Sequence, residues 1–389
     1  MRKRIFCTVT NDLSYDQRMI RICSSLAGAG YDVTLVGRKV PGSIALDKKA
    51  FRQRRLRLFF HRGKLFYLEY NFRLFFYLLF RKMDCICAID LDTILPCYFV
   101  SRLRGIPRVY DAHELFCEMP EVAARPRIRA IWKAVEKYAV PAFRHGYTVN
   151  GLIAAEFFNM YGVEYGVIRN VPVLKEGAPD NESVMREGIG AKVSGEASGP
   201  RGPWEGWKGE RFLLYQGAVN EGRCFETLIP AMQYVDMKLV ICGDGNYMEQ
   251  ARALVQQYGL EDKVVFRGYV LPGQLKDITR SAWCGINLVD RKGLNHYYSL
   301  ANRWFDYMHA GIPQLSVNYP AYREINNLYR IAVLLDEPGV REIANALNAL
   351  LNNTDLYATL LENCKQARLH YNWQEEEKSL LRLYQKIVR

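Results

Sequence analysis

Residues 295–313 read NHYYSLANRWFDYMHAGIP and carry the strongest local signal in the chain. The stretch opens as a polar loop and continues as a helix that directs Trp304, Tyr307 and Met308 toward a core. Gly311 and Pro313 then stop the helix, because glycine commonly closes a helix and proline cannot continue one. We therefore expect a loop, a short helix and a sharp turn here.

Short apolar runs alternate with amphipathic stretches on both sides of this segment. Strands are expected at 5–9, 32–37, 55–60, 85–88, 108–110 and 146–149, and again at 211–216, 238–242, 264–267, 285–289 and 314–317. Such alternation predicts an α/β fold of two Rossmann-like domains with parallel sheets. Ligands bind beyond the carboxyl ends of these strands, so we expect the active site in a cleft between two facing sheets.

Length and composition agree with two soluble globular domains. A chain of 389 residues, 49% hydrophobic and 24% charged, is too long for one ordinary core. Residues 1–175 and 210–370 are expected to form the domains, with a linker at 176–209 that is rich in Gly, Pro, Ser and Glu. Residues 371–389 are expected to form a helix that crosses back to the N-terminal domain.

Cysteine usage and the N-terminus indicate a cytoplasmic protein. The ten cysteines lie mostly within apolar runs, without a Cys-x-x-Cys pair beside histidines, so we expect reduced core residues and no metal site. The first apolar stretch is too short for a signal peptide, and no segment reaches transmembrane length. We expect no nucleic-acid partner, and the sequence leaves the oligomeric state open.

Residues 48–82 hold most of the positive charge. This segment contains eleven Lys and Arg and one acid, Glu69, so it contributes +10 to the net charge of +12. Many aromatic residues lie between the basic ones. This composition favours contact with anionic lipid head groups or polyphosphates at the cytoplasmic face of a membrane. An ordinary strand followed by a helix explains the same pattern, so both interpretations stay open.

In the second half, three glycine-containing turns follow successive expected strands. Glycine lets backbone amides approach a phosphate, and an arginine can hold a diphosphate with two hydrogen bonds. A plain strand-to-helix turn remains an alternative for each one. The candidate residues in these turns are Gly217, Asn220, Arg223, Gly243, Gly245 and Tyr269.

In the first half, polar residues again follow expected strands. Asp111, His113 and Glu114 end the strand at 108–110, and these side chains could position a hydroxyl or polarise a sugar. A hydrogen-bonded structural histidine is the alternative for His113. Further candidates in the loops of this half, with solvated turn residues as the alternative, are Asp16, Arg18, Asp90 and Asp92.

The stretch at 295–313 resembles the donor-binding signature of the retaining GT-B glycosyltransferases of family four, also described as glycosyl transferases group 1. It matches the variant Ser-Leu-x-Asn-(Lys/Arg)-x-Phe-(Glu/Asp)-Tyr. The resemblance implies that Asp306 holds the ribose of a sugar nucleotide and that the amides of Ser299 and Leu300, with Asn302 nearby, contact its diphosphate. Tyr298 stands where the family has a glutamate near the donor sugar.

The same resemblance extends to other loops. Arg223 stands at the family's lysine in the phosphate loop, and Ala218 stands at its arginine. His113 matches a histidine that faces the donor sugar, within the family's Asp-x-His-Glu. In this interpretation the catalytic residues are His113, Glu114 and Arg223. The residues on the acceptor side are Asp16, Arg18, Asp90 and Asp92. No metal cofactor is needed.

The resemblance implies a metal-independent, retaining transfer of sugar from a nucleoside diphosphate sugar to a hydroxyl of a glycan or lipid-linked acceptor, in cell-surface polysaccharide or glycoconjugate synthesis. The N-terminal domain would bind the acceptor and the C-terminal domain the donor. A sugar-nucleotide epimerase of the same fold and a non-catalytic sugar-nucleotide-binding subunit remain as alternatives. The sequence is silent on base, sugar and acceptor.

Overall fold

The computed structural model describes residues 2–174 and 211–388, so the linker expected at 176–209 lies outside the described residues. The chain forms two compact units. The first unit comprises residues 1–171, 292–300 and 373–389, and the second comprises 172–291 and 301–372. Residues 292–300, which the sequence analysis placed in the C-terminal domain, thus belong to the first unit.

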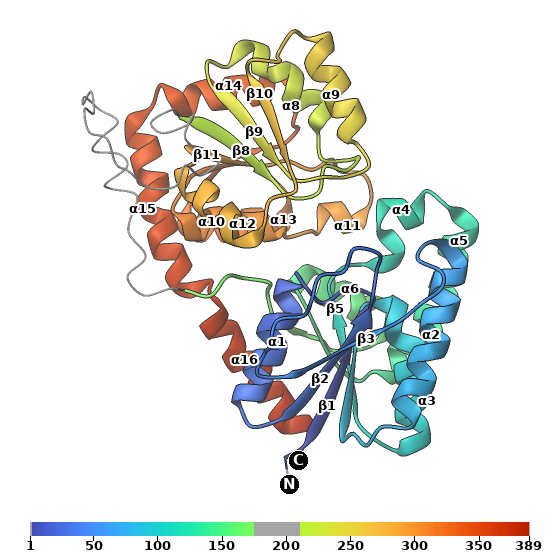
Figure 1. Cartoon of the computed structure of the whole chain (residues 1–389). Helices are drawn as coiled ribbons and strands as arrows, with labels where there is room; N and C mark the ends of the chain where they lie inside the picture. The colour runs from blue at the N-terminus through green and yellow to red at the C-terminus, as the bar shows by residue number, and fades with distance from the viewer. Residues whose placement is uncertain (1, 175–210, 389) are drawn as a thin grey trace, which may run out of the picture. The chain divides into compact units, whose positions relative to one another are not determined.

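The first unit is built on a seven-stranded parallel sheet (Figure 1). Its strand order is β3-β2-β1-β4-β5-β6-β7, with β4 at its centre and β1 paired to β2 and β4. Buried apolar runs such as Cys-Ile-Cys-Ala-Ile in β4 explain why these segments form interior strands. The strands are β1 (Arg4–Thr8), β2 (Asp32–Arg38), β3 (Arg52–Leu56), β4 (Cys85–Ile89), β5 (Arg108–Ala112), β6 (His145–Thr148) and β7 (Gly166–Val167).

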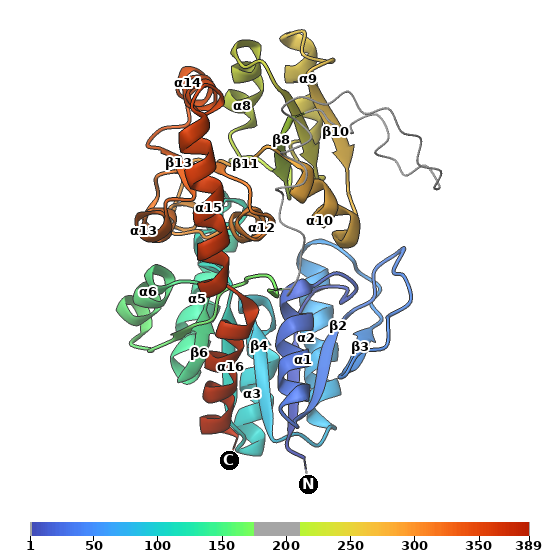
Figure 2. The same cartoon turned by 90° about the vertical axis from the view of Figure 1, so that its left-hand side faces the viewer.

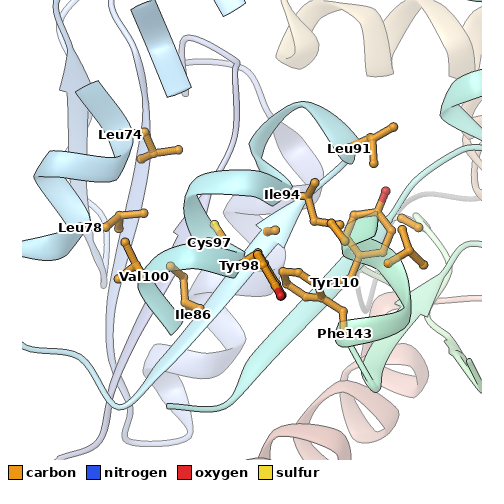
Figure 3. Packing of buried hydrophobic residues seen from close by; sticks show 14 of the residues in the cluster. Leu74, Leu78, Ile86, Leu91, Ile94, Cys97, Tyr98, Val100, Tyr110 and Phe143 are labelled. Carbon is orange, nitrogen blue, oxygen red and sulfur yellow. The ribbon is translucent and has the colours of Figure 1, made fainter. Parts of the chain in front are cut away.

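Helices cover both faces of this sheet (Figure 1). The helices of the first unit are α1 (Gln17–Gly28), α2 (Gly63–Leu79), α3 (Ile94–Arg104), α4 (Pro120–Ala123), α5 (Pro126–Ala139), α6 (Gly151–Tyr161), α11 (Leu294–Tyr297) and α16 (Trp373–Ile387). The short helices α4 and α11 lie beyond the strand ends (Figure 1). One core lies under α2 and α3, where Tyr98, Tyr110 and Phe143 pack close together (Figure 3). The rings of Tyr110 and Phe143 lie 5.9 Å apart.

The C-terminal helix α16 packs beside α1 (Figure 2). Trp373 donates its indole N–H to Ser25 Oγ at 2.9 Å, and Glu376 pairs with Arg169 at 3.1 Å. Leu380 and Tyr384 of the same helix are fully buried. The last helix of the chain therefore completes the core of the first unit.

The second unit is built on a six-stranded parallel sheet of order β10-β9-β8-β11-β12-β13. Its strands are β8 (Phe212–Gln216), β9 (Lys238–Cys242), β10 (Val264–Gly268), β11 (Cys284–Asn287), β12 (Gln314–Val317) and β13 (Ala332–Leu335). Its helices are α8 (Phe225–Ala231), α9 (Met248–Gln257), α10 (Pro272–Ser281), α12 (Asn302–Ala310), α13 (Pro320–Tyr329), α14 (Val340–Leu351) and α15 (Thr354–His370).

Helix α12 is fixed to this second sheet by Tyr307. The buried Tyr307 hydroxyl donates to Leu214 O at 2.9 Å and accepts from Gln216 N at 3.2 Å. Gly285 of β11 lies under the ring, where an added Cβ would come within 2.3 Å of it. The glycine is therefore needed to bring the helix this close to the sheet.

The α/β fold with two Rossmann-like parallel sheets is confirmed, but several element boundaries differ from the expectation. The strand expected at 55–60 is β3, which covers 52–56, because residues 59–62 already lead into α2 at Gly63. Strands β7 and β13 were not predicted, because their short runs lack a clear alternation. Across residues 2–174 and 211–388, none of the helices combines the length and apolarity needed to span a bilayer.

Candidate functional site

Polar side chains from three neighbouring strands gather at the carboxyl edge of the first sheet. Thr10 follows β1, Asp90 and Asp92 follow β4, and Asp111 lies at the end of β5 with His113 just beyond it. Because β1, β4 and β5 are adjacent and parallel, their ends meet at one edge. Arg18 reaches the same place from the first turn of α1.

Arg18 and Asp111 form a buried ion pair in this group. Two guanidinium nitrogens of Arg18 donate to the carboxylate of Asp111, at 2.8 and 3.3 Å, and a third bond goes to Ile168 O at 3.0 Å. Burial alone would raise the pKa of Asp111, but Arg18 and then His113 overcome it and hold the pKa at about 2. Asp111 is therefore a fixed negative charge.

His113 lies between two carboxylates. Its Nδ1 is 3.3 Å from Asp90 Oδ2, and its Nε2 is 3.3 Å from Asp111 Oδ2. The second contact is not aligned as a hydrogen bond, since Nε2 is buried without a hydrogen-bond partner. Burial would lower the pKa of His113, yet Asp90 and Asp111 raise it to about 9. The imidazole is thus protonated at neutral pH.

Asp90 and Asp92 flank the histidine. Asp90 has a φ of 56°, unusual for a residue with a side chain, and its Oδ1 accepts from His113 N at 3.0 Å. Asp92 accepts from Thr10 Oγ1 at 2.6 Å. Burial and the neighbouring Asp90 raise the pKa of Asp92 to about 7. Near neutral pH the site therefore combines the protonated imidazole of His113 with the carboxyl group of Asp92, which titrates in that range.

Two predicted residues of this half lie outside that charge group. Asp16 is the N-cap of α1 and accepts from Met19 N at 3.0 Å, which gives it a structural role. Glu114 is exposed and accepts from Asn295 Nδ2 at 2.9 Å. The same Asn295 accepts from Leu115 N at 3.0 Å.

Asn295 therefore anchors the segment 292–300 to the loop after β5. Tyr298 packs partly buried against the first unit's core, and its carbonyl accepts from Asn150 Nδ2 at 2.7 Å. The amide of Ser299 donates to His296 O at 3.2 Å. Helix α12 begins at Asn302, so Ser299 and Leu300 lie just before its first turn, and their contact with a diphosphate stays a prediction.

In the second unit, glycines interlock the loops after β8 and β9. An added Cβ would come within 1.8 Å of Gly217 O at Gly243, and within 2.2 Å of Val219 O at Gly245. Asn220 Oδ1 accepts from Asn246 N at 3.2 Å across the same junction. Gly217, Gly243 and Asn220 thus build the loops, and their proposed donor contacts remain a prediction.

Asp306 and two arginines lie along these loops. Gln216, the last residue of β8, donates to Asp306 Oδ2 at 3.0 Å, so the carboxylate is held at the start of the loop after β8. Arg223 has a buried Nε without a hydrogen-bond partner. Arg303 is buried over the ring of Tyr215, 4.4 Å from its centroid.

The remaining predicted donor residues, Tyr269 and Asn302, are both exposed, at the end of β10 and at the start of α12. For the described part of the chain, no group of three His, Cys, Asp or Glu side chains is placed to hold a metal ion.

Sequence reasoning missed one pairing and two further residues of these sites. Asp111 was expected to act on a hydroxyl or a sugar beside His113 and Glu114, but its pairing with both Arg18 and His113 was not expected. Asn295 fixes the segment 292–300, and Arg303 lies in the helix whose acid was singled out. All three residues lie close in sequence to predicted site residues, and that closeness was the signal by which they could have been found. It could not show which distant segments they pair with.

Two sequence families match the chain, one for each domain. The model described as Glycosyltransferase Family 4 matches residues 17–172. The model described as Glycosyl transferases group 1 matches residues 204–367. Among curated proteins, no sequence matches the chain.

Known structures share the fold over nearly the whole chain. Sucrose-phosphate synthase from Thermosynechococcus elongatus is 18% identical, with 99% of each chain covered and a TM-score of 0.75. HepE from Anabaena, in complex with UDP and glucose, is 13% identical, with 98% of this chain and 99% of that chain covered and a TM-score of 0.72. WaaG, a glycosyltransferase involved in lipopolysaccharide biosynthesis, is 16% identical, with coverage of 98% and 99% and a TM-score of 0.67. At these identities the likeness shows a GT-B fold and nothing finer.

Proposed function

The chain belongs to the glycosyltransferases, because glycosyltransferase family models match both of its domains, and we propose which reaction it catalyses. In this proposal a sugar passes from a nucleoside diphosphate sugar to a hydroxyl group. The anomeric configuration of the sugar is retained. The proposed acceptor is a glycan or a lipid-linked sugar of cell-surface polysaccharide or glycoconjugate synthesis. The transfer is proposed to need no metal ion, because side-chain cations of the second unit would hold the diphosphate.

The observation that carries this proposal is the position of Asp306. Its carboxylate lies 3.0 Å from Gln216 Nε2, at the carboxyl end of the central strand β8, and the loop that carries Arg223 follows directly. A carboxylate accepts hydrogen bonds from two ribose hydroxyls, and a cation nearby attracts a diphosphate. This pairing suits a nucleoside diphosphate.

The first unit supplies a second set of groups for the reaction. His113 is an imidazolium at neutral pH, so it can donate a hydrogen bond to a hydroxyl of the transferred sugar but cannot accept a proton. Asp92 has a pKa of about 7 and can accept a proton from an acceptor hydroxyl near neutral pH. Asp90 positions the histidine through its side-chain and backbone contacts.

The proposal is tested with the purified chain and a panel of UDP, GDP and ADP sugars, with and without lipid-linked sugar acceptors. Release of nucleoside diphosphate that depends on the acceptor supports transfer, and NMR of the product gives its anomeric configuration. An isomerised donor would instead support an epimerase, and binding without turnover would support a non-catalytic subunit. Turnover that persists in EDTA supports the metal-independent scheme.

An acceptor at a membrane agrees with the surface around α2. This helix buries Phe66, Tyr70, Leu74 and Leu78 and exposes Leu65, Leu68, Phe72 and Phe76 on its other side. Beside it lies a groove of about 760 Å³ lined by Lys39, Arg54, Arg55, Leu56, Arg57, Phe72, Arg73 and Phe76. Exposed apolar side chains next to a basic groove fit the surface of a bilayer that contains anionic lipids.

Two of these arginines are suited to a test of membrane contact. Arg55 is unsuitable because it is bound to Asp12 at 2.7 Å, whereas Arg54 and Arg57 are exposed. Arg54→Gln with Arg57→Gln should reduce sedimentation with phosphatidylglycerol vesicles at low salt, since each basic residue near such a surface contributes about 1 kcal/mol. The control, Arg127→Gln with Arg144→Gln, removes the same charge from exposed positions outside the groove. Equal vesicle binding by both double variants would contradict membrane contact through this surface.

A further inference from the structure

Arg303 is a buried cation in the first turn of α12, and no carboxylate pairs with it among the residues that the structure describes. Only 7% of the residue is exposed. Its Nη1 is buried without a hydrogen-bond partner. The contact that the guanidinium does make is with the ring of Tyr215, at 4.4 Å.

A buried charge of this kind is costly unless something compensates for it. Moving a guanidinium out of water loses its hydration, and a single cation–π contact compensates for only part of that loss. Proteins commonly retain such a charge where a ligand of opposite sign binds. The unpaired state of Arg303 therefore indicates an anion that the chain itself does not supply.

The position of Arg303 indicates where that anion binds. The guanidinium carbon and Nη1 both lie 3.8 Å from the place where a Cβ would stand on Gly217. Gly217 itself is exposed and has a φ of 121°, a conformation that side chains rarely adopt. The site directly above the buried charge is thus kept free of side chains.

Gly217 is also the first residue after β8 and the neighbour of Gln216, which holds Asp306. Ala218, the next residue, is exposed and carries no charge. Arg223, six residues after Gly217, is the other cation of this loop and also has an unpaired nitrogen. The loop after β8 therefore contributes one cation, Arg223, and lies over a second cation, Arg303 of α12.

We propose that Arg303 provides the second positive charge for the diphosphate of the donor, acting from beneath Gly217 in place of an arginine at position 218. The inference rests on the proposed function and deepens it by naming a further donor-binding residue. An anion seated over Gly217 would lie close enough to the guanidinium, in a protein interior, for the charge to change its affinity by about tenfold or more.

The test uses inorganic pyrophosphate, which probes the charge site without knowledge of the base. We expect Arg303→Met to weaken pyrophosphate binding at least tenfold in isothermal titration calorimetry, and to weaken binding of UDP, GDP or ADP by a similar factor. Binding of the matching nucleoside, which lacks phosphate, should not change. The methionine keeps the apolar stem over Tyr215, so the fold should be retained, and its melting temperature should not fall.

A relocated charge separates binding from structural support. Ala218→Arg in the Arg303→Met background should restore pyrophosphate affinity, because it places a cation over the same loop. Arg303→Lys should retain part of the affinity.

An unchanged pyrophosphate dissociation constant in Arg303→Met, or lost binding that Ala218→Arg fails to restore, would overturn the inference. These results are distinct from failure of the proposed function, in which the unaltered chain would bind neither pyrophosphate nor any of the nucleoside diphosphates.

Discussion

Replacing Asp90 by asparagine should remove the charge from His113. The side chains have the same shape, and asparagine tolerates the positive φ of 56° at this position. It can still accept from His113 N, as Asp90 Oδ1 does at 3.0 Å. The substitution therefore changes mainly one charge, which lies 3.3 Å from His113 Nδ1.

The size of the effect follows from the surroundings of His113. Its pKa of about 9 exceeds the ordinary value of 6.5 by an amount worth roughly 3 kcal/mol. Burial and Arg18 both oppose this rise, so Asp90 and Asp111 together must contribute more than the net difference, with Asp90 the larger. Loss of Asp90 should therefore remove at least half of the rise in the pKa of His113. At pH 8 the charged fraction of His113, about nine tenths in the unaltered chain, should fall.

The measurement is an NMR titration of the imidazole signals. The chain contains six histidines, and the signal of His113 is identified by its absence from His113→Gln. Glu114→Gln is the control, because it removes a carboxylate in the same loop that contacts Asn295. Its His113 should keep a pKa of about 9. An ordinary pKa for His113 in the unaltered chain, or no change in Asp90→Asn, would refute the proposed charge arrangement.

Three further predictions concern the two sites. Arg223→Ala should lower kcat at least tenfold by removing a diphosphate cation, and unaltered kinetics would exclude it from that role. Asp306→Ala should weaken binding of the cognate nucleoside diphosphate about tenfold, measured by calorimetry, and an equal dissociation constant would contradict ribose contact. The pKa of Asp92 is raised to about 7, so its buried charge costs stability as pH rises above about 4, where the unfolded chain is already ionised. Asp92→Asn should therefore stabilise the fold at pH 8 by on the order of 4 kcal/mol and have little effect at pH 4, measured by thermal denaturation. Equal stability of the variant and the unaltered chain at pH 8 would mean that the carboxyl is not desolvated.

The sequence predicted the two parallel sheets because apolar strands and glycine-ended helices leave a local signal. Residues 85–89, for example, are buried on both faces and cannot be taken for a surface loop. The loops after β4, β5 and β8 were located for the same reason, since polar residues directly follow those strands. Asp90, His113 and Arg223 were therefore found before any contact was known.

The contacts that define the sites were not predictable in this way. Arg18 and Asp111 lie 93 residues apart, and only folding brings them together. The motif at 295–313 was interpreted as one piece, but Asn295 binds the loop after β5 while Asp306 binds the end of β8. Local periodicity contains no information on which domain a loop will join. The boundary between the two units after residue 300 could therefore be seen only in the folded structure.

The return of α16 to the first unit has a consequence for the order of events during translation. Leu380 and Tyr384 are fully buried in the first unit, and Trp373 bonds to Ser25 across 348 positions. A nascent chain that has completed the first sheet therefore still lacks α16, which packs beside α1. The first unit can complete its core only after residues 373–387 have been synthesised, when the residues of the second unit have already been made.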